Sequence, residues 1–156
     1  MIIITSASRG IGKYLFEKFK SEGKEVIGFY NKTVPQNLEQ EHYKIDVTKE
    51  DEILQFFENH KDQLNKIILI NTAGISYNSF GHKAELNSWK NVFDVNVFGA
   101  FNLINGALPI MRENGFGRII NFASVVAQKG VPGTSAYAAS KASLWEMSKA
   151  LAIGNV

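Results

Sequence analysis

Two side chains near the end of the chain have types and a spacing that suit acid–base chemistry. Tyr137 and Lys141 are four residues apart in a segment that the sequence predicts as a helix, so they share one helix face. A free phenol titrates near ~10, too high for efficient proton transfer at neutral pH, and a neighbouring ammonium favours the phenolate. Ser124 follows a short apolar run, where its hydroxyl is placed to bond a substrate oxygen. Such a pair alone is typical of an exposed helix surface, and the preceding Ser124 favours the catalytic interpretation.

A second candidate site is the segment TSASRGIG at residues 5–12, between an apolar run and an amphipathic stretch. Glycine lets a backbone approach a pyrophosphate closely, and the start of a helix offers unpaired N–H groups. The strict G-x-G-x-x-G string is missing, so an ordinary strand-to-helix turn is the alternative.

The end of the predicted second strand bears on the choice of cofactor. An NAD site usually has a carboxylate about 20 residues beyond the glycines, where it binds the ribose hydroxyls. Here the segment is Tyr30-Asn31-Lys32, without a carboxylate. Arg9 and Lys32 suit a 2′-phosphate instead, which favours NADP(H) over NAD(H). Either cation also fits a solvated surface.

Asn96 interrupts an apolar helical stripe, three residues after Phe93 and four before Ala100. A buried amide is costly unless it is hydrogen-bonded, so we expect a structural or a catalytic partner for it. The spacing alone favours a structural role.

The elements that must position these residues follow from the hydrophobic pattern. Apolar runs predict strands at residues 2–5, 25–30, 42–47, 66–71 and 117–123. Amphipathic stretches predict helices at residues 10–22, 85–111 and 135–153. A capping box of Thr48 and Asp51 predicts one more helix, with Ile53, Leu54, Phe56 and Phe57 on its apolar face. The alternation is typical of a doubly wound, Rossmann-like, three-layer α/β fold with a parallel sheet, in a single domain over residues 1–156.

Composition excludes several classes of function. The chain has 156 residues and a net charge of +2, and its 17 basic residues are scattered, so we expect neither a nucleic acid nor a membrane as partner. The absence of cysteine excludes disulfides and thiolate chemistry. His42, His60 and His82 match no ligand spacing, so no metal site is expected. We expect a cytoplasmic protein.

Taken together, these segments resemble the short-chain dehydrogenase/reductase family over nearly the whole chain. The family pattern Thr-Gly-x-x-x-Gly-x-Gly matches residues 5–12, except that Ser6 replaces the first glycine. Asp46-Val47 is similar to the acidic–hydrophobic pair that contacts the adenine, and residues 71–74 (NTAG) resemble the family's Asn-Asn-Ala-Gly. The sequence is also similar to the bacterial 3-oxoacyl-carrier-protein reductases of this family, without fixing a substrate.

The resemblance implies an NADP(H)-dependent oxidoreductase that reduces a small-molecule carbonyl to an alcohol, or the reverse, with Tyr137 as proton donor. It implies that Lys141 grips the nicotinamide ribose and that Asn96 holds a water linking Lys141 to solvent. The implied catalytic residues are Asn96, Ser124, Tyr137 and Lys141. The implied cofactor-binding residues are Thr5, Ser6, Ser8, Arg9, Gly10, Ile11, Gly12, Asn31, Lys32, Asp46, Val47, Asn71, Ala73, Gly74, Tyr137 and Lys141.

The family pattern continues beyond the Tyr137 helix with a sixth strand, a segment that closes over the substrate and usually a seventh strand. We therefore expect a chain that is incomplete at its C-terminus, with the strand at residues 117–123 either left as a sheet edge or covered by another chain. It is then a fragment of an active reductase, a nucleotide-binding module that catalyses poorly, or an assembly piece. The resemblance also implies a homo-oligomer formed through the Asn96 and Tyr137 helices.

Overall fold

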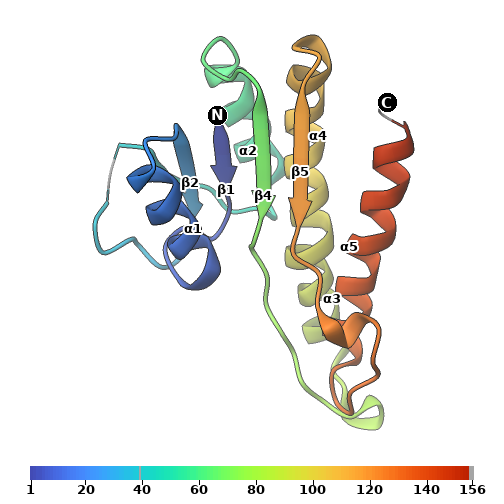
Figure 1. The fold of residues 1–156 in the computed structure, drawn as a ribbon. Coiled ribbons are helices and arrows are strands. Elements are labelled where there is room, and N and C mark those ends of the chain that lie inside the picture. The colour runs from blue at the N-terminus through green and yellow to red at the C-terminus, as the bar shows by residue number, and fades with distance from the viewer. Residues whose placement is uncertain (39, 155–156) are drawn as a thin grey trace.

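A parallel sheet forms the centre of the molecule in the computed structural model, which describes residues 1–38 and 40–154 (Figure 1). Its strand order is β3-β2-β1-β4-β5, with every described pairing parallel. The strands are β1 (Ile2–Ile4), β2 (Val26–Tyr30), β3 (His42–Lys44), β4 (Ile67–Asn71) and β5 (Gly117–Asn121). The predicted parallel α/β fold is confirmed, and β5 is an edge strand within the described part of the chain.

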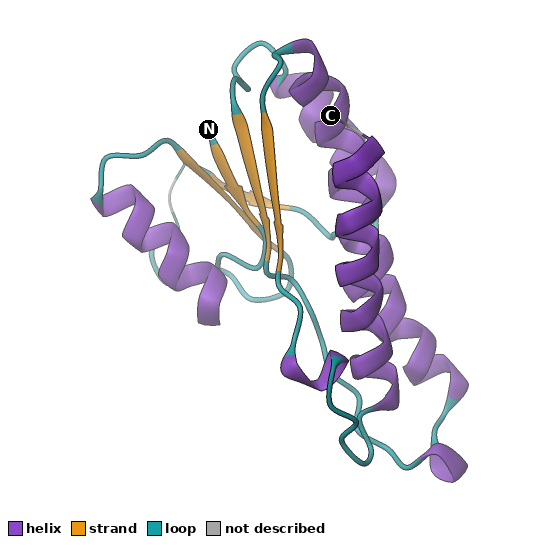
Figure 2. Ribbon diagram, turned by 45° about the vertical axis from the view of Figure 1, so that its right-hand side comes forward, coloured by secondary structure: helices purple, strands orange, loops and turns teal. Residues whose placement is uncertain are grey.

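Helices cover the two faces of this sheet unequally. They are α1 (Gly10–Ser21), α2 (Glu50–His60), α3 (Leu86–Phe93), α4 (Gly99–Glu113) and α5 (Ser135–Gly154). Helix α1 lies on one face, and α2, α4 and α5 lie on the other (Figure 2). Parallel strands need such crossover helices, and the result is the three-layer arrangement that the sequence predicts.

Alternation along the strands divides the hydrophobic core between the two faces. In β1, Ile3 packs into the core shared with α2 and α4, whereas Ile2 and Ile4 pack with Phe16 on the α1 side. Burying a side chain such as Phe16 contributes roughly 1.5–3 kcal/mol. Since successive side chains of β1 are buried on opposite faces, the strand is apolar throughout rather than alternating.

The long helix predicted over residues 85–111 is interrupted. Between α3 and α4 lies one π-helical turn, η2 (Asp94–Phe98), and α4 continues to Glu113. A π turn holds an extra residue, which changes the direction in which its side chains point, and such turns are frequent at functional sites. Asn96 lies at the centre of this turn and is 1% exposed.

The predicted capping box before α2 is wrong. The N-cap residue is Lys49, and no side chain among the described residues caps this helix. The Thr48 hydroxyl instead donates to Asp46 Oδ1 at 2.8 Å, so it serves the preceding loop. Leu54 is also 42% exposed, because the buried face of α2 is formed by Ile53, Phe56 and Phe57.

Candidate active site

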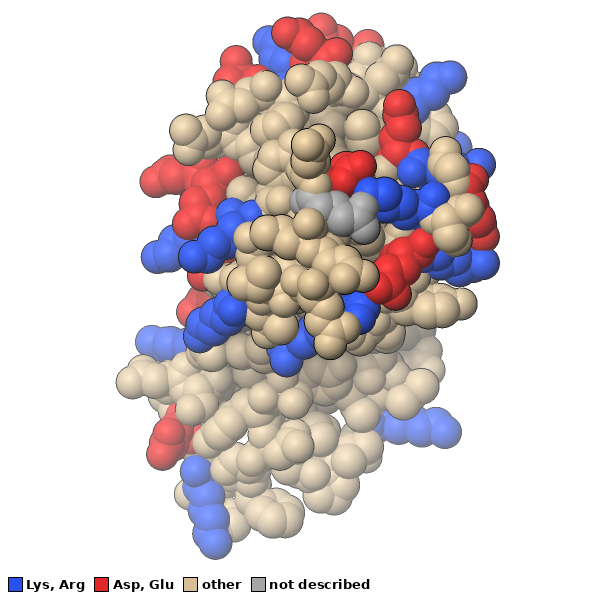
Figure 3. All heavy atoms as spheres, turned by 90° about the vertical axis from the view of Figure 1, so that its left-hand side faces the viewer, with Lys and Arg blue, Asp and Glu red and all other residues tan. Residues whose placement is uncertain are grey.

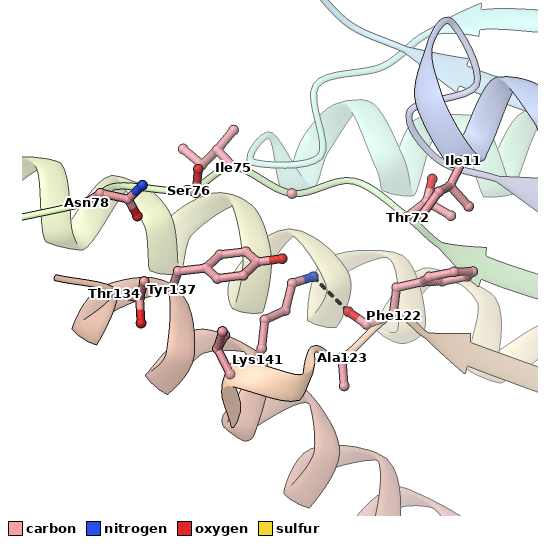
Figure 4. A pocket seen from close by; sticks show the side chains of 12 residues that line it. Ile11, Thr72, Ile75, Ser76, Asn78, Phe122, Ala123, Thr134, Tyr137 and Lys141 are labelled. Carbon is pink, nitrogen blue, oxygen red and sulfur yellow. Dashed lines mark hydrogen bonds between the residues drawn. The ribbon is translucent and has the colours of Figure 1, made fainter. Parts of the chain in front are cut away.

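A cavity of about 470 Å³ opens where the carboxyl ends of β4 and β5 meet the start of α1 (Figure 4). Tyr137 and Lys141 enter it from α5, and Ile11 enters it from the first turn of α1. The other lining residues belong to the chain segments that come after β4 and after β5. They are Thr72, Gly74, Ile75, Ser76, Asn78, Phe122, Ala123, Val126 and Thr134. The crevice expected beyond the strand ends is therefore present, and the tyrosine–lysine pair faces it.

Lys141 is almost fully buried in this cavity wall, with 4% of its surface exposed. Its Nζ donates to the backbone carbonyl of Phe122 at 2.7 Å and lies 5.7 Å from the centroid of the Tyr137 ring. In Figure 4 the phenol oxygen and the amine point into the same space. Burial lowers the pKa of Lys141, because removal from water disfavours the charged amine.

Both N–H groups of the Asn96 side chain donate to other groups of the protein. Its Oδ1 accepts from the Ile75 backbone N–H at 2.8 Å, and its Nδ2 donates to the Ile75 carbonyl at 2.9 Å. Nδ2 also donates to Ser140 Oγ at 2.9 Å. The buried amide thus has the partners that its burial requires. A water molecule bound to this side chain would donate to the second lone pair of Oδ1.

Ser124 lies between β5 and a short 3₁₀ turn, η3 (Val125–Ala127). Its Oγ accepts from the Val126 N–H at 3.4 Å, and the residue is half-buried. Its neighbours Ala123 and Val126 line the cavity, whereas Ser124 itself is not among the lining residues. Its contact with a substrate oxygen stays a prediction.

The bend after β1 is tied to the loop after β4 by hydrogen bonds through Thr5. Thr5 Oγ1 accepts from the N–H groups of Thr72 and Ala73, each at 2.9 Å, and the Thr72 hydroxyl donates to the Thr5 carbonyl. A Cβ added at Gly12 would lie 2.7 Å from both the Thr5 carbonyl oxygen and Thr72 Oγ1. The bend and the loop therefore approach each other as closely as a glycine at this position allows.

The backbone of the same bend takes left-handed conformations at Ser6 (φ 55°) and Gly10 (φ 56°). Ser6 stands where the family pattern has its first glycine, and a left-handed L-residue costs roughly 1–2 kcal/mol. No atom lies within 4 Å of where a Gly10 side chain would begin, and no described side chain caps α1 at Arg9. An open, uncapped helix start fits an anionic group such as a pyrophosphate.

The ends of β2 and β3 bring Asn31 and Asp46 together. Burial alone would raise the pKa of Asp46, but hydrogen bonds from the Thr48 N–H and hydroxyl and from the Asn31 side chain lower it overall. The predicted third strand ends at Lys44, so Asp46 and Val47 belong to the following loop. Val47 is 8% exposed and packs in the core, and its backbone carbonyl accepts from Asn102 Nδ2 at 3.1 Å.

The two cations predicted to bind a 2′-phosphate follow neighbouring strands. Arg9 comes after β1 and Lys32 comes after β2, and both are exposed. Because these strands pair in parallel, the two loops lie at the same end of the sheet, beyond the carboxyl ends of its strands. Ser8, beside Arg9, is half-buried.

Over the view in Figure 3, basic and acidic side chains are interspersed. On α1, for example, Lys18 pairs with Glu22 at 2.8 Å.

Two further predicted cofactor residues have structural surroundings of their own. Asn71 is 4% exposed, and its Nδ2 donates to Asn121 Oδ1 at 2.9 Å across β4 and β5. Asn71 Oδ1 has no partner among the described residues. A Cβ at Gly74 would lie 3.3 Å from Asn96 Oδ1 and 3.4 Å from Lys141 Nζ, so this glycine lies directly against the Lys141 amine.

Sequence reasoning missed Ser140, which is fully buried between Tyr137 and Lys141. The signal was available. Ser140 shares the buried face of α5 with Lys141 and Leu144, so it is a polar residue in a buried stripe, as Asn96 is.

Within residues 1–38 and 40–154, no group of three His, Asp or Glu side chains is arranged to hold a metal ion. None of the described helices has the length and apolar character needed to cross a membrane.

Comparison with known proteins gives the following similarities. The family model described as short chain dehydrogenase matches residues 1–154. Acetoacetyl-CoA reductase of Rhizobium meliloti is 34% identical over 157 residues, which cover 96% of this chain and 65% of the relative. A 3-oxoacyl-(acyl-carrier-protein) reductase of Thermotoga maritima is 34% identical over 158 residues, covering 94% of this chain and 64% of the relative. The ligand-free structure of Thermoplasma acidophilum aldohexose dehydrogenase superposes with a TM-score of 0.90 at 30% identity, covering 98% of this chain and 60% of that chain.

Proposed function

The chain belongs to the short-chain dehydrogenase family, and from that premise we propose that it binds NADP(H) and exchanges a hydride between this cofactor and the carbonyl or alcohol carbon of a small substrate. This chain spans 65% of the length of the acetoacetyl-CoA reductase that it resembles, so the activity of the whole protein is stated as a proposal. One observation carries the proposal: the phenol of Tyr137 and the amine of Lys141 face one cavity, whose opposite wall includes the first turn of α1.

The proton-transfer part of the proposal assigns one task to each side chain. The bound cofactor supplies the hydride to the carbonyl carbon. Tyr137 gives its phenolic proton to the substrate oxygen, so its O–H bond breaks as the O–H bond of the alcohol forms. The Lys141 ammonium, 5.7 Å from the ring centroid, stabilises the negative charge left on the phenol oxygen. Ser124 donates a hydrogen bond to the same substrate oxygen and holds it near Tyr137.

The residues proposed to bind the cofactor lie beyond the carboxyl ends of the strands. The uncapped start of α1, with open space at Gly10, receives the pyrophosphate. Arg9 and Lys32 pair with the 2′-phosphate, and the absence of a carboxylate after β2 supports NADP(H) over NAD(H). Asn31 and Asp46 border the adenine. Lys141 binds the nicotinamide ribose and exchanges its bond to the Phe122 carbonyl for this contact.

We propose that copies of the protein associate through the helices that carry Asn96 and Tyr137. Large apolar side chains are exposed along them, namely Phe98 (55%), Phe101 (45%) and Trp145 (41%). Exposed apolar surface of this kind is typical of an interface. A cytoplasmic location stays a prediction.

Replacement of Tyr137 by Phe tests the function. Tyr137→Phe removes the phenolic O–H and keeps the ring, so we expect turnover to fall by about 10²–10⁴-fold, the usual contribution of a general acid. NADPH oxidation is followed with acetoacetyl-CoA and a longer 3-oxoacyl thioester, NADP⁺ reduction with an aldohexose, and NADPH affinity by fluorescence titration. The affinity is expected to stay within about twofold, which is less than 0.5 kcal/mol.

Tyr14→Phe is the matched control, because Tyr14 is 62% exposed on α1 and its loss should leave turnover unchanged. Substantial turnover in Tyr137→Phe would assign the proton donor to another group. NADPH binding without any turnover in the unaltered protein would favour a nucleotide-binding module instead.

A further inference from the structure

Ser140 is fully buried between the two proposed catalytic residues of α5, and its hydroxyl is engaged on both sides. The hydroxyl donates its single proton to the Tyr137 carbonyl at 2.8 Å and accepts from Asn96 Nδ2 at 2.9 Å. A serine hydroxyl has one donor, so these two bonds have one possible direction. Ser140 therefore links the turn that carries Tyr137 to the π turn η2.

The other end of this link is equally fixed. The Asn96 amide can face Ile75 in one orientation, because Ile75 presents both an N–H and a carbonyl to it, at 2.8 and 2.9 Å. That orientation leaves the second Nδ2 proton of Asn96 to Ser140. A continuous series of hydrogen bonds then runs from Ile75 through Asn96 and Ser140 to the Tyr137 backbone, and both Ile75 and Tyr137 line the cavity.

We propose that Ser140 is a positioning residue, whose hydroxyl fixes the Tyr137 turn of α5 against the loop after β4, and this inference rests on the proposed function. Ser140 is not among the residues that line the cavity, and it acts through the Tyr137 backbone. Hydrogen bonds in a buried series are stronger than exposed ones, and an unpaired buried N–H is costly. Loss of the hydroxyl leaves one N–H of Asn96 without an acceptor. The Tyr137 turn is then held less firmly against the loop after β4.

Ser143 provides a matched control on the same helix. Its hydroxyl makes the same kind of local bond, donating to the Ala139 carbonyl at 2.9 Å. No bond to Asn96 or to another π-turn residue is described for it. Both serines thus donate within the helix, Ser140 to the carbonyl three residues back and Ser143 to the one four back. They differ in burial, since Ser143 is half-buried, and in the link across to η2.

The test compares Ser140→Ala with Ser143→Ala in the full protein that shows carbonyl turnover. A misplacement of about 1 Å costs on the order of 10²-fold in rate, so we expect kcat of Ser140→Ala to fall by about 10–100-fold. KM for the carbonyl substrate and NADPH affinity should stay within about twofold, because neither binding surface loses a contact. Ser143→Ala should keep its kcat. In Asn96→Ala, further replacement of Ser140 should cost nothing more, since the two residues act in series.

Each contrary result identifies what has failed. Turnover in the unaltered protein with an unchanged kcat in Ser140→Ala overturns this inference alone, as does an additive cycle with Asn96→Ala. Equal losses in Ser140→Ala and Ser143→Ala overturn it too, because the effect would then belong to the helix. Lack of turnover in the unaltered protein overturns the proposed function and this inference with it. If Ser140→Ala does not fold, Ser140→Cys keeps a weak donor and a weak acceptor in a slightly larger side chain, and a smaller kcat loss without a KM change is expected.

Discussion

The two walls of the crevice are built from different materials. The cofactor wall, residues 5–12 with residues 72–74, consists mainly of backbone, glycines and short side chains packed together, with Arg9 and Ile11 as its long side chains. The proposed catalytic wall, Tyr137 and Lys141 backed by Asn96 and Ser140, consists of polar side chains, three of them at least 96% buried. The first wall works through the close approach of main chains and the second through placed functional groups. An added atom should therefore damage the cofactor wall, and a removed atom should damage the catalytic wall.

The largest expected effect comes from a removal on the catalytic wall. Lys141→Met keeps a long side chain but removes the amine and its bond to the Phe122 carbonyl. We expect turnover to fall by at least about 100-fold, because proton transfer loses its stabilising charge. NADPH affinity should weaken as well, since the ribose contact is lost, and this separates Lys141→Met from Tyr137→Phe in a fluorescence titration.

The same variant has a pH signature. Burial lowers the pKa of Lys141 from its usual 10.5, so the folded protein releases this proton at a lower pH than the unfolded chain does. Between the lowered pKa and 10.5 the unfolded state binds more protons, and the free energy of unfolding rises with pH in that window. Urea unfolding at successive pH values should show this rise in the wild type and lose it in Lys141→Met. An identical rise in both proteins would mean that Lys141 is not its source.

The second effect comes from an addition on the cofactor wall. In Gly12→Ala the new methyl would lie 2.7 Å from the Thr5 carbonyl oxygen and from Thr72 Oγ1, so the bend and the loop must separate. Overpacking of this kind costs about 1–3 kcal/mol. We expect a loss of this size in unfolding free energy and a weakening of NADPH affinity by about tenfold, measured by urea unfolding and fluorescence titration.

Gly81→Ala is the control for Gly12→Ala, because no atom lies within 4 Å of the added methyl and Gly81 has no positive φ. Its NADPH affinity should be unchanged, and its unfolding free energy should rise by about 0.4–1 kcal/mol because alanine loses less chain entropy on folding than glycine. If Gly12→Ala behaves like this control, close approach of main chains does not govern the cofactor wall.

The sequence predicted the fold, and a shared helix face for Tyr137 and Lys141, for a physical reason. Strands buried on both faces appear as short apolar runs, and a helix places residues four apart on one face. The spacing alone is equally typical of an exposed helix surface, so the cavity that the pair faces is a property of the fold. The π turn leaves no such trace, because the apolar stripe around Asn96 is compatible with an uninterrupted helix. Capping failed in a similar way, since Thr48 binds Asp46 in a loop whose path depends on tertiary contacts.

Ser140 shows what a local pattern omits. The sequence places it on a helix beside Tyr137, but its partner Asn96 is 44 residues away and is brought to it only by the packing of α5 against η2. The same holds for the contact of Thr5 with Thr72, which spans 67 residues. The residue types of both walls are visible in the sequence, whereas the hydrogen bonds that join them are a property of the fold.

The smallest expected effect sharpens the description of the cofactor wall as a backbone device. Ser6 has a φ of 55°, a conformation that costs an L-residue roughly 1–2 kcal/mol and glycine almost nothing. Glycine also loses more entropy on folding, by roughly 0.5–1 kcal/mol, so Ser6→Gly should stabilise the protein by about 0.5 kcal/mol net. In thermal unfolding this is a rise in Tm of about 1–2 °C for a chain of this size. Ser8 is two residues away without a positive φ, so Ser8→Gly carries the entropy loss alone and should lower the Tm. Opposite signs at these two serines would show that backbone conformation, rather than the serine side chains, governs the bend, and a fall in both would contradict it.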